Sequence, residues 1–270
     1  MNVAHVFRSF FRRTFEKICN LFFPVTCPFC EKPMPRLYPG YCSDCHKELW
    51  RLREKTCSVC GMRFSNPDMP SPICADCRGH RFPYVSITAP VSYNRKSVKN
   101  AVLSFKFGGK IGNFRPFGVM MSLAVKKQFS GVPFDYITYI PSRLKRMKQR
   151  GFCPPELLAE ELSHQLSLPY IGTLKKIRDT RHQSTLSIKE RRTNLKDAFI
   201  CTKPEQVSGK TILLVDDVVT TGSSLKECAK TLRRAGAKKV YCVTFARTEK
   251  PRGEFTADDF EPYDEYSILP

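Results

Sequence analysis

The pattern of hydrophobic and polar positions along this 270-residue chain divides it into four parts. Residues 1–24 carry apolar side chains at helical spacing with basic residues between them, which predicts an amphipathic helix. Residues 25–80 have few apolar runs and many cysteines. Residues 81–250 alternate short apolar runs with helical patterns, and residues 251–270 form an acidic tail.

The third part has the pattern of an α/β domain. The expected strands span residues 84–93, 136–140, 211–215 and 240–246, and the expected helices span residues 96–107, 116–129, 155–166 and 224–235. This alternation predicts a mostly parallel sheet with helices on both faces. Ligands of such sheets bind at the carboxyl ends of the strands, where Ser142, Asp216 and Asp217 are expected to meet.

The most informative stretch is TILLVDDVVTTGSSL, residues 211–225. A β-branched apolar run predicts a buried strand, and two acidic residues follow where that strand should end. A loop of small polar residues then leads into a helix, whose N-terminus favours a phosphate. The pattern predicts a sugar-phosphate site with adjacent carboxylates for vicinal ribose hydroxyls. The plainer interpretation is an ordinary buried strand with an acidic end.

Four CxxC pairs occur in the second part, separated by 11, 11 and 13 residues. Two such pairs complete a tetrahedral site, so the spacing predicts two structural zinc ions in a double zinc ribbon. Sequential pairing is favoured because each loop is short, although a crossed arrangement remains open. The expected ligands are Cys27, Cys30, Cys42 and Cys45 for one ion, and Cys57, Cys60, Cys74 and Cys77 for the other.

The chain is strongly basic, with a net charge of +20. From Gly253 onward it has six acidic and no basic residues, which leaves a charge of +26 on the remainder. Such a charge attracts polyanions, so we expect single-stranded DNA to bind the ribbons and residues 99–110 and 143–150. The alternative is that the charge only favours solubility.

Two features bear on the compartment. No cleavable signal peptide and no apolar run of roughly 20 residues occurs, which predicts a reducing, cytoplasmic location. The helix expected over residues 1–23 either packs on the protein or lies on the inner face of a membrane.

The stretch VDDVVTTGSS resembles the signature of type I phosphoribosyltransferases, which bind phosphoribosyl pyrophosphate (PRPP) with Mg²⁺. The resemblance implies that Asp216 and Asp217 hold the ribose hydroxyls. It assigns the 5′-phosphate to Thr220, Thr221, Gly222 and Ser223, and the pyrophosphate loop to Ser142 and Arg143. It also implies a flexible loop over the site, with candidate residues Arg178, Gln183, Arg191 and Asn194.

A narrower resemblance covers nearly all of residues 21–247. The paired ribbons, LSFKFGGK, PSRLKRMKQRGF, RDTRHQSTLSIKERRTNL and VDDVVTTG together resemble the ComF family of competence-associated proteins. The family implies handling of single-stranded DNA in natural transformation, with an ATP-dependent DNA translocase as partner. Cys153 departs from the asparagine that often follows RGF in this family.

One position departs from the 6-oxopurine salvage enzymes of the phosphoribosyltransferase superfamily. They carry an aspartate that assists the base where this chain has Thr220, which cannot act as a carboxylate base. Three hypotheses therefore remain: a ComF-type PRPP-binding protein acting in DNA uptake, a phosphoribosyltransferase for a small base or amine, and a non-catalytic nucleic-acid-binding or regulatory protein.

Overall fold

The computed structural model describes residues 25–34, 40–50, 55–64, 71–142, 147, 150–178, 195 and 197–249. The helix expected over residues 1–24 and the tail expected over residues 251–270 lie outside these residues. Among the described residues, no helix has the length and apolar character needed to cross a membrane.

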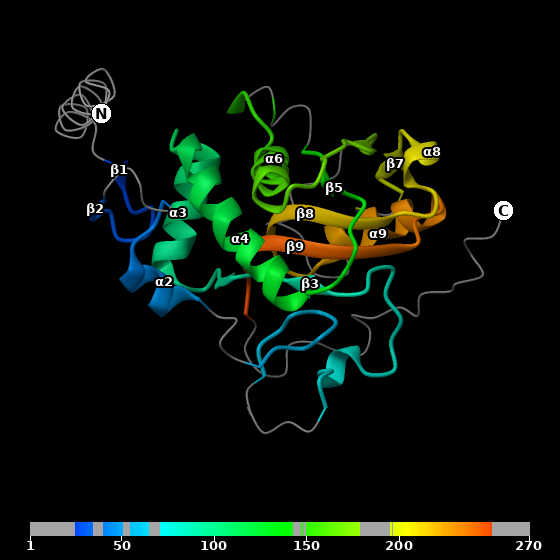
Figure 1. Ribbon diagram of the computed structural model, residues 1–270, viewed down its shortest axis with the longest axis horizontal. Helices are drawn as coiled ribbons and strands as arrows, with labels where there is room; N and C mark the ends of the chain where they lie inside the picture. The colour runs from blue at the N-terminus through cyan, green and yellow to red at the C-terminus, as the bar shows by residue number, and fades with distance from the viewer. Residues whose placement is uncertain are drawn as a thin grey trace, which may run out of the picture.

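A five-stranded parallel sheet forms the centre of the molecule (Figure 1). Its order is β3-β9-β8-β5, and β4 also pairs with β9. The strands are β3 (Ile87–Thr88), β4 (Val91–Ser92), β5 (Tyr136–Tyr139), β8 (Thr211–Val219) and β9 (Lys239–Arg247). Every pair in this sheet is parallel, which confirms the fold class expected from the sequence.

Two strands differ from the sequence expectation. The single strand expected over residues 84–93 is two short strands, because Pro90 lacks an N–H group and interrupts the ladder between β3 and β4. The strand expected to end at residue 215 continues to Val219. Its pairing with β9 persists beyond the apolar run, with Asp216 opposite Thr244.

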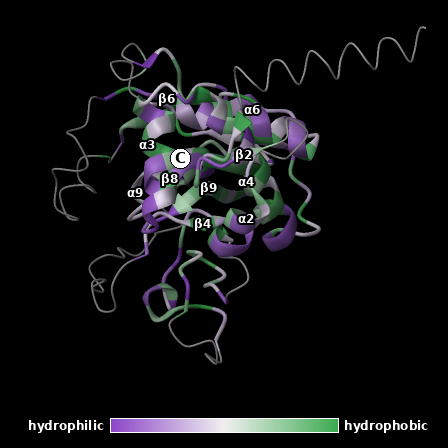
Figure 2. Cartoon of the chain, turned by 90° about the vertical axis from the view of Figure 1, so that its left-hand side faces the viewer, coloured by the Kyte–Doolittle hydropathy of each residue, from purple (hydrophilic) through white to green (hydrophobic). Residues whose placement is uncertain are grey.

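Helices cover both faces of the sheet. The helices α3 (Lys96–Phe107), α4 (Phe114–Gln128) and α6 (Pro154–Leu166) share one buried core with the inner side chains of β8 and β9. The helix α9 (Ser223–Arg234) packs on the opposite face, in a second core that includes Cys228. Hydrophilic residues line the outer side of α9, as its amphipathic pattern requires (Figure 2).

Smaller elements complete the domain. The strands β6 (Leu174–Lys176) and β7 (Phe199–Cys201) form an antiparallel pair beside the sheet. The remaining short elements are the 3-10 turn at Ile111–Asn113 and the helix α8 (Pro204–Val207). The expected flexible loop therefore begins and ends on a small two-stranded sheet. Most of that loop lies outside the described residues.

The cysteine-rich part packs against the sheet domain. It contains β1 (Val25–Thr26), β2 (Pro33–Met34), α2 (Ser43–Leu49) and a 3-10 turn at Ala75–Cys77. The ring of Phe29 stacks on Phe117 and Phe245, with ring centroids 6.1 and 6.2 Å away. The second cysteine group is joined to β3, because Ile87 N–H donates to Val59 O at 2.8 Å. The first group therefore packs on the core shared with α3, α4 and α6, whereas Val59 of the second group packs against the core that includes α9.

Candidate functional site

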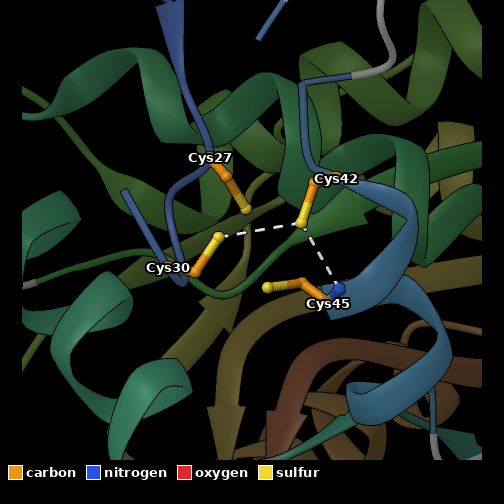
Figure 3. A group of neighbouring side chains, drawn as sticks. All are labelled: Cys27, Cys30, Cys42 and Cys45. Carbon is orange, nitrogen blue, oxygen red and sulfur yellow. Dashed lines mark hydrogen bonds between the residues drawn. The ribbon is translucent and has the colours of Figure 1, made fainter. Parts of the chain in front are cut away.

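The first metal centre is formed by Cys27, Cys30, Cys42 and Cys45, which converge between the β1–β2 turn and α2 (Figure 3). Their four sulfur atoms lie within 4.8 Å of one another, and those of Cys30 and Cys42 are 3.7 Å apart. A tetrahedral zinc ion with Zn–S bonds of about 2.3 Å separates neighbouring sulfurs by about 3.8 Å. The cysteine geometry therefore fits zinc.

The second centre repeats this arrangement with Cys57, Cys60, Cys74 and Cys77. The sulfurs of Cys60 and Cys74 are 3.8 Å apart, and Cys74 N–H donates to Cys57 Sγ at 3.3 Å. An added Cβ at Gly61 would lie 2.4 Å from Ile87 O, so glycine permits this close docking on β3.

The two centres establish sequential pairing of the four CxxC motifs. The crossed arrangement left open by the spacing is excluded, because each group of four sulfurs takes two consecutive pairs. Four cysteines leave a zinc ion no open coordination position, so these centres suit a structural role. His46 belongs to neither group and instead stacks between Tyr41 and Trp50.

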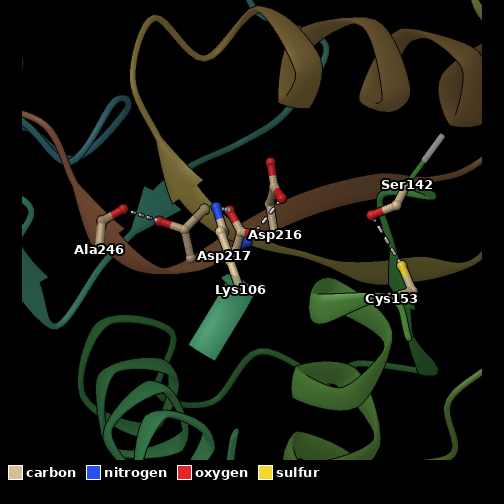
Figure 4. A network of polar contacts seen from close by, with 7 residues as sticks. Lys106, Ser142, Cys153, Asp216, Asp217 and Ala246 are labelled. Atoms are coloured by element: carbon tan, nitrogen blue, oxygen red, sulfur yellow. Dashed lines mark hydrogen bonds and ion pairs between the residues drawn. The ribbon is translucent and has the colours of Figure 1, made fainter. Parts of the chain in front are cut away.

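The acidic pair lies near the carboxyl end of β8, where its two side chains leave the strand in different directions (Figure 4). Asp217 points toward α3, where its Oδ1 accepts a hydrogen bond from Lys106 Nζ at 2.7 Å. Asp216 lies on the α9 side, and its Oδ1 accepts from Asp217 N–H at 2.8 Å. This alternation follows from the two-residue repeat of a strand.

The electrostatic environment of Asp216 is unusual for an aspartate. Burial raises its pKa to about 8, and the neighbouring Asp217 carboxylate adds to this rise. Lys106 and Lys176 oppose it. Asp216 therefore holds its proton near neutral pH beside the Asp217 carboxylate, and a ligand that brings a cation or hydroxyl donors favours its ionised form.

A polar loop follows directly and opens α9. Gly222 adopts a left-handed conformation with φ of +78°, which a residue with a side chain reaches only at a cost. The hydroxyl oxygens of Thr221 and Ser223 are 2.9 Å apart, so the two side chains form a hydrogen bond across the turn. The loop therefore presents hydroxyl groups and helix N–H groups together, as a phosphate site requires.

A pocket of about 390 Å³ joins the acidic pair to this loop. Ser142, Asp216, Asp217 and residues 220–223 all line it, so the fold brings these candidate residues together. Arg178 follows β6, is exposed and does not line the pocket. Four other candidates lie outside the described residues: Arg143, Gln183, Arg191 and Asn194.

The structure adds pocket residues that the sequence analysis had not assigned to the site. Lys106 reaches it from the end of α3, Lys176 from β6 and Phe199 from β7. Phe107 is 69% exposed beside them, and the Arg150 guanidinium lies 4.2 Å from the centre of its ring. The KFGG sequence at the end of the predicted helix was the signal that could have pointed to Lys106 and Phe107. The sequence alone does not show that this helix end lies beside β8.

Two family models match parts of this chain. Residues 18–78 match the family model of the double zinc ribbon domain, and residues 155–262 match that of the phosphoribosyl transferase domain. The DNA utilization protein YhgH of Salmonella typhi is 31% identical over 192 residues, which cover 70% of this chain and 82% of that protein. Competence protein F of Haemophilus influenzae is 33% identical over 148 residues, covering 53% and 65% respectively.

Among solved structures, glutamine phosphoribosylpyrophosphate (PRPP) amidotransferase from B. subtilis aligns with 53% of this chain and 30% of its own. The sequences are 19% identical over the alignment, and the TM-score is 0.34.

Proposed function

Since this chain belongs to the ComF family of competence-associated phosphoribosyltransferase-like proteins, we propose that it binds PRPP with Mg²⁺ and acts in the uptake of single-stranded DNA. The observation that carries the PRPP assignment is the acidic pair of β8, followed at once by a phosphate-type loop at the start of α9. The DNA role is supported by the printed names of the relatives and by the basic charge of the chain.

In the proposed complex, Asp216 and Asp217 accept hydrogen bonds from the two ribose hydroxyls. The loop of residues 220–223 holds the 5′-phosphate through its N–H and hydroxyl groups. Ser142 and Arg143 contact the pyrophosphate, and residues of the flexible loop close over it. The candidates in that loop remain Arg178, Gln183, Arg191 and Asn194.

Magnesium fits this site on charge. The raised pKa of Asp216 reflects its burial first and the adjacent Asp217 carboxylate second, and the neighbouring lysines only partly offset these two effects. Bound with PRPP, the ion would neutralise the pyrophosphate. The protein would orient the sugar, while Lys106 and Lys176 add positive charge at the pocket wall.

The position of Thr220 argues against salvage of 6-oxopurines. It lines the pocket where the 6-oxopurine salvage enzymes carry an aspartate that assists the base, and a threonine hydroxyl does not act as a base near neutral pH. We therefore favour a protein that binds PRPP, as a ligand or sensor, over an enzyme of 6-oxopurine salvage.

The proposed location is cytoplasmic, with a DNA translocase as partner. For residues 1–23 the two expectations stay packing on the protein and binding to the inner face of the membrane.

One observation favours a second candidate, transfer of phosphoribose to a planar base or amine. Phe107 offers an exposed ring in the same pocket as the acidic pair, and aromatic rings stack readily on planar acceptors. This candidate requires pyrophosphate release, which simple binding does not.

Isothermal titration calorimetry with PRPP and Mg²⁺ tests the proposal. The double variant Asp216→Asn/Asp217→Asn should bind roughly 100-fold more weakly, because hydrogen bonds to charged groups contribute about 1.5–3 kcal/mol each. Glu48→Gln, an exposed carboxylate in α2, is the matched control and should bind like the native protein. Unchanged affinity in the folded double variant would reject the ribose assignment.

A pyrophosphate-release assay separates binding from catalysis. The protein is incubated with PRPP and Mg²⁺ in the presence of bases and amines, with and without single-stranded DNA. Release that depends on one acceptor supports the transferase, whereas tight binding without release supports the binding protein.

A further inference from the structure

A second pocket lies at the opposite end of the sheet from the acidic pair. It has a volume of about 410 Å³ and is lined by the segment that leaves the second cysteine group, by the end of α9 and by the start of β9. The lining residues are Arg81, Phe82, Pro83, Tyr84, Val85, Arg233, Lys238, Lys239 and Val240. Lys239 begins β9 and Thr244 lies opposite Asp216, so about 17 Å of strand separates the two sites.

The lining of this pocket is cationic. Four of its residues are basic, and none of the described residues that line it is acidic. Arg233 Nη1 donates to the carbonyl oxygens of Ala237 and Lys238, which fixes the turn between α9 and β9. Lys238 and Lys239 are exposed on that turn, and within the described chain neither forms an ion pair.

One acidic group whose charge interacts with Lys238 is already engaged. Asp135 pairs with Lys210 at 3.1 Å and accepts from Thr211 N–H at 2.8 Å, so it serves to hold β5 and β8 together. Lys238 interacts with this carboxylate only electrostatically. The two lysines of the turn are therefore available to an anion.

The lining of this pocket also includes two aromatic rings. The rings of Phe82 and Tyr84 stack with centroids 5.3 Å apart, and Tyr84 is buried whereas Phe82 is half-buried. Val85 N–H donates to Val240 O at 2.7 Å, which attaches the segment that carries these rings to β9. Aromatic rings and cations that line one pocket form a combination that binds unpaired bases by stacking and phosphates by charge.

We propose that this pocket binds a nucleotide of single-stranded nucleic acid, with its base stacked on Phe82 and its phosphates beside Lys238 and Lys239. The proposal rests on the DNA-handling role given above and adds a location for it, distinct from the PRPP site. Stacking requires an unpaired base but reads no sequence, so binding favours single strands over duplexes and is independent of sequence.

Fluorescence anisotropy with a labelled 15-nucleotide oligothymidylate tests the site. Lys238→Ala/Lys239→Ala should weaken binding roughly tenfold at low salt. Loss of two phosphate contacts should also flatten the slope of log affinity against log salt by about 1.4. The control Lys126→Ala/Lys127→Ala removes the same charge from the exposed end of α4 and should change affinity less than twofold.

The aromatic lining needs a variant that keeps the fold. Phe82→Leu retains an apolar side chain but removes the ring, and should weaken binding roughly fivefold or more. Its melting temperature shows whether the fold survives, and PRPP affinity should stay unchanged in every variant because that site lies at the other end of the sheet.

Each outcome decides the proposal. Equal losses in the two lysine pairs would overturn it, because charge alone would then account for binding. Mononucleotide binding as tight as that of the oligonucleotide would overturn it in favour of a free nucleotide. If the native protein binds no oligonucleotide, the DNA role itself fails, whereas binding that resists all pocket variants leaves that role and rejects only this site.

Discussion

Lys106 Nζ lies 2.7 Å from Asp217 Oδ1, and the two residues are 111 positions apart in the chain. Their side chains are only 19% and 15% exposed, so the pair is largely removed from water. It joins the end of α3 to the end of β8 and neutralises one of two adjacent acids. The pocket therefore forms only when these two elements pack together.

We expect Lys106→Met to lower the free energy of unfolding by about 1–2 kcal/mol at pH 7, because it leaves a largely buried carboxylate without its partner. Chemical denaturation measures this loss. Lys110→Met is the matched control: Lys110 pairs with Glu31 at an exposed site, so the loss of stability there should be much smaller. Additive effects of Lys106→Met and Asp217→Asn in a double-mutant cycle would contradict a direct coupling.

The free energy of unfolding should depend on pH through the titration of Asp216. Its pKa in the folded protein, about 8, exceeds its ordinary value of 3.8, so the folded state holds the proton more tightly than the unfolded state. The contribution of Asp216 to stability should therefore be fully present below pH 3.8, and it should be lost as the pH rises toward 8. Asp216→Asn should remove this decline and stabilise the protein by at least about 1 kcal/mol at pH 8.

Denaturation curves at pH 4 and pH 8 measure the effect, with Asp44→Asn as an exposed control. If Asp216→Asn raised the free energy of unfolding equally at pH 4 and at pH 8, the result would contradict the titration of Asp216.

Gly222 should affect ligand binding beyond its effect on stability. Gly222→Ala forces a side chain into the left-handed region, at a cost of roughly 1–2 kcal/mol, and should weaken PRPP binding roughly tenfold by redirecting the loop N–H groups. Gly222→Asn should be milder, because asparagine tolerates this conformation. Calorimetry and denaturation measure the two effects.

Gly131 provides the control, because it has a similar left-handed conformation away from the site. It has φ of +75° and open space around it, so Gly131→Ala should lose similar stability yet bind PRPP normally. Equal losses of affinity in the two alanine variants would show that the loop has no special part in binding.

Zinc content should fall in steps. Elemental analysis should find two zinc ions in the native protein, and one in the variant Cys30→Ala/Cys42→Ala, because these two cysteines share a single centre. The matched variant Cys30→Ala/Cys60→Ala removes one ligand from each centre and should weaken both. Two ions retained by Cys30→Ala/Cys42→Ala would contradict the ligand assignment.

Removal of zinc should also destabilise the sheet domain. The first centre holds Phe29 against Phe117 and Phe245, so chelation should loosen part of the main core and lower the melting temperature. Cys201→Ser, which alters a cysteine outside both groups, should keep two zinc ions and the native response to chelator.

Several features were determined by local sequence alone. The CxxC spacings predict eight zinc ligands, since two thiolates of one turn reach the same ion wherever the turn lies. The β-branched run before Asp216 and the helix after Gly222 predict the strand, loop and helix of the phosphate-type site. Residues 96–107 form the expected helix because its apolar face and its terminal glycines are local signals.

Tertiary packing decided the rest. Sequence spacing allowed two pairings of the cysteine motifs, and only the folded chain brings consecutive pairs together. The meeting of Lys106 with Asp217, and of Phe29 with Phe245, depends on how helices and ribbons dock on the sheet. Local propensity carries no information about such contacts, because they join residues far apart in the chain and form only when a shared core is buried.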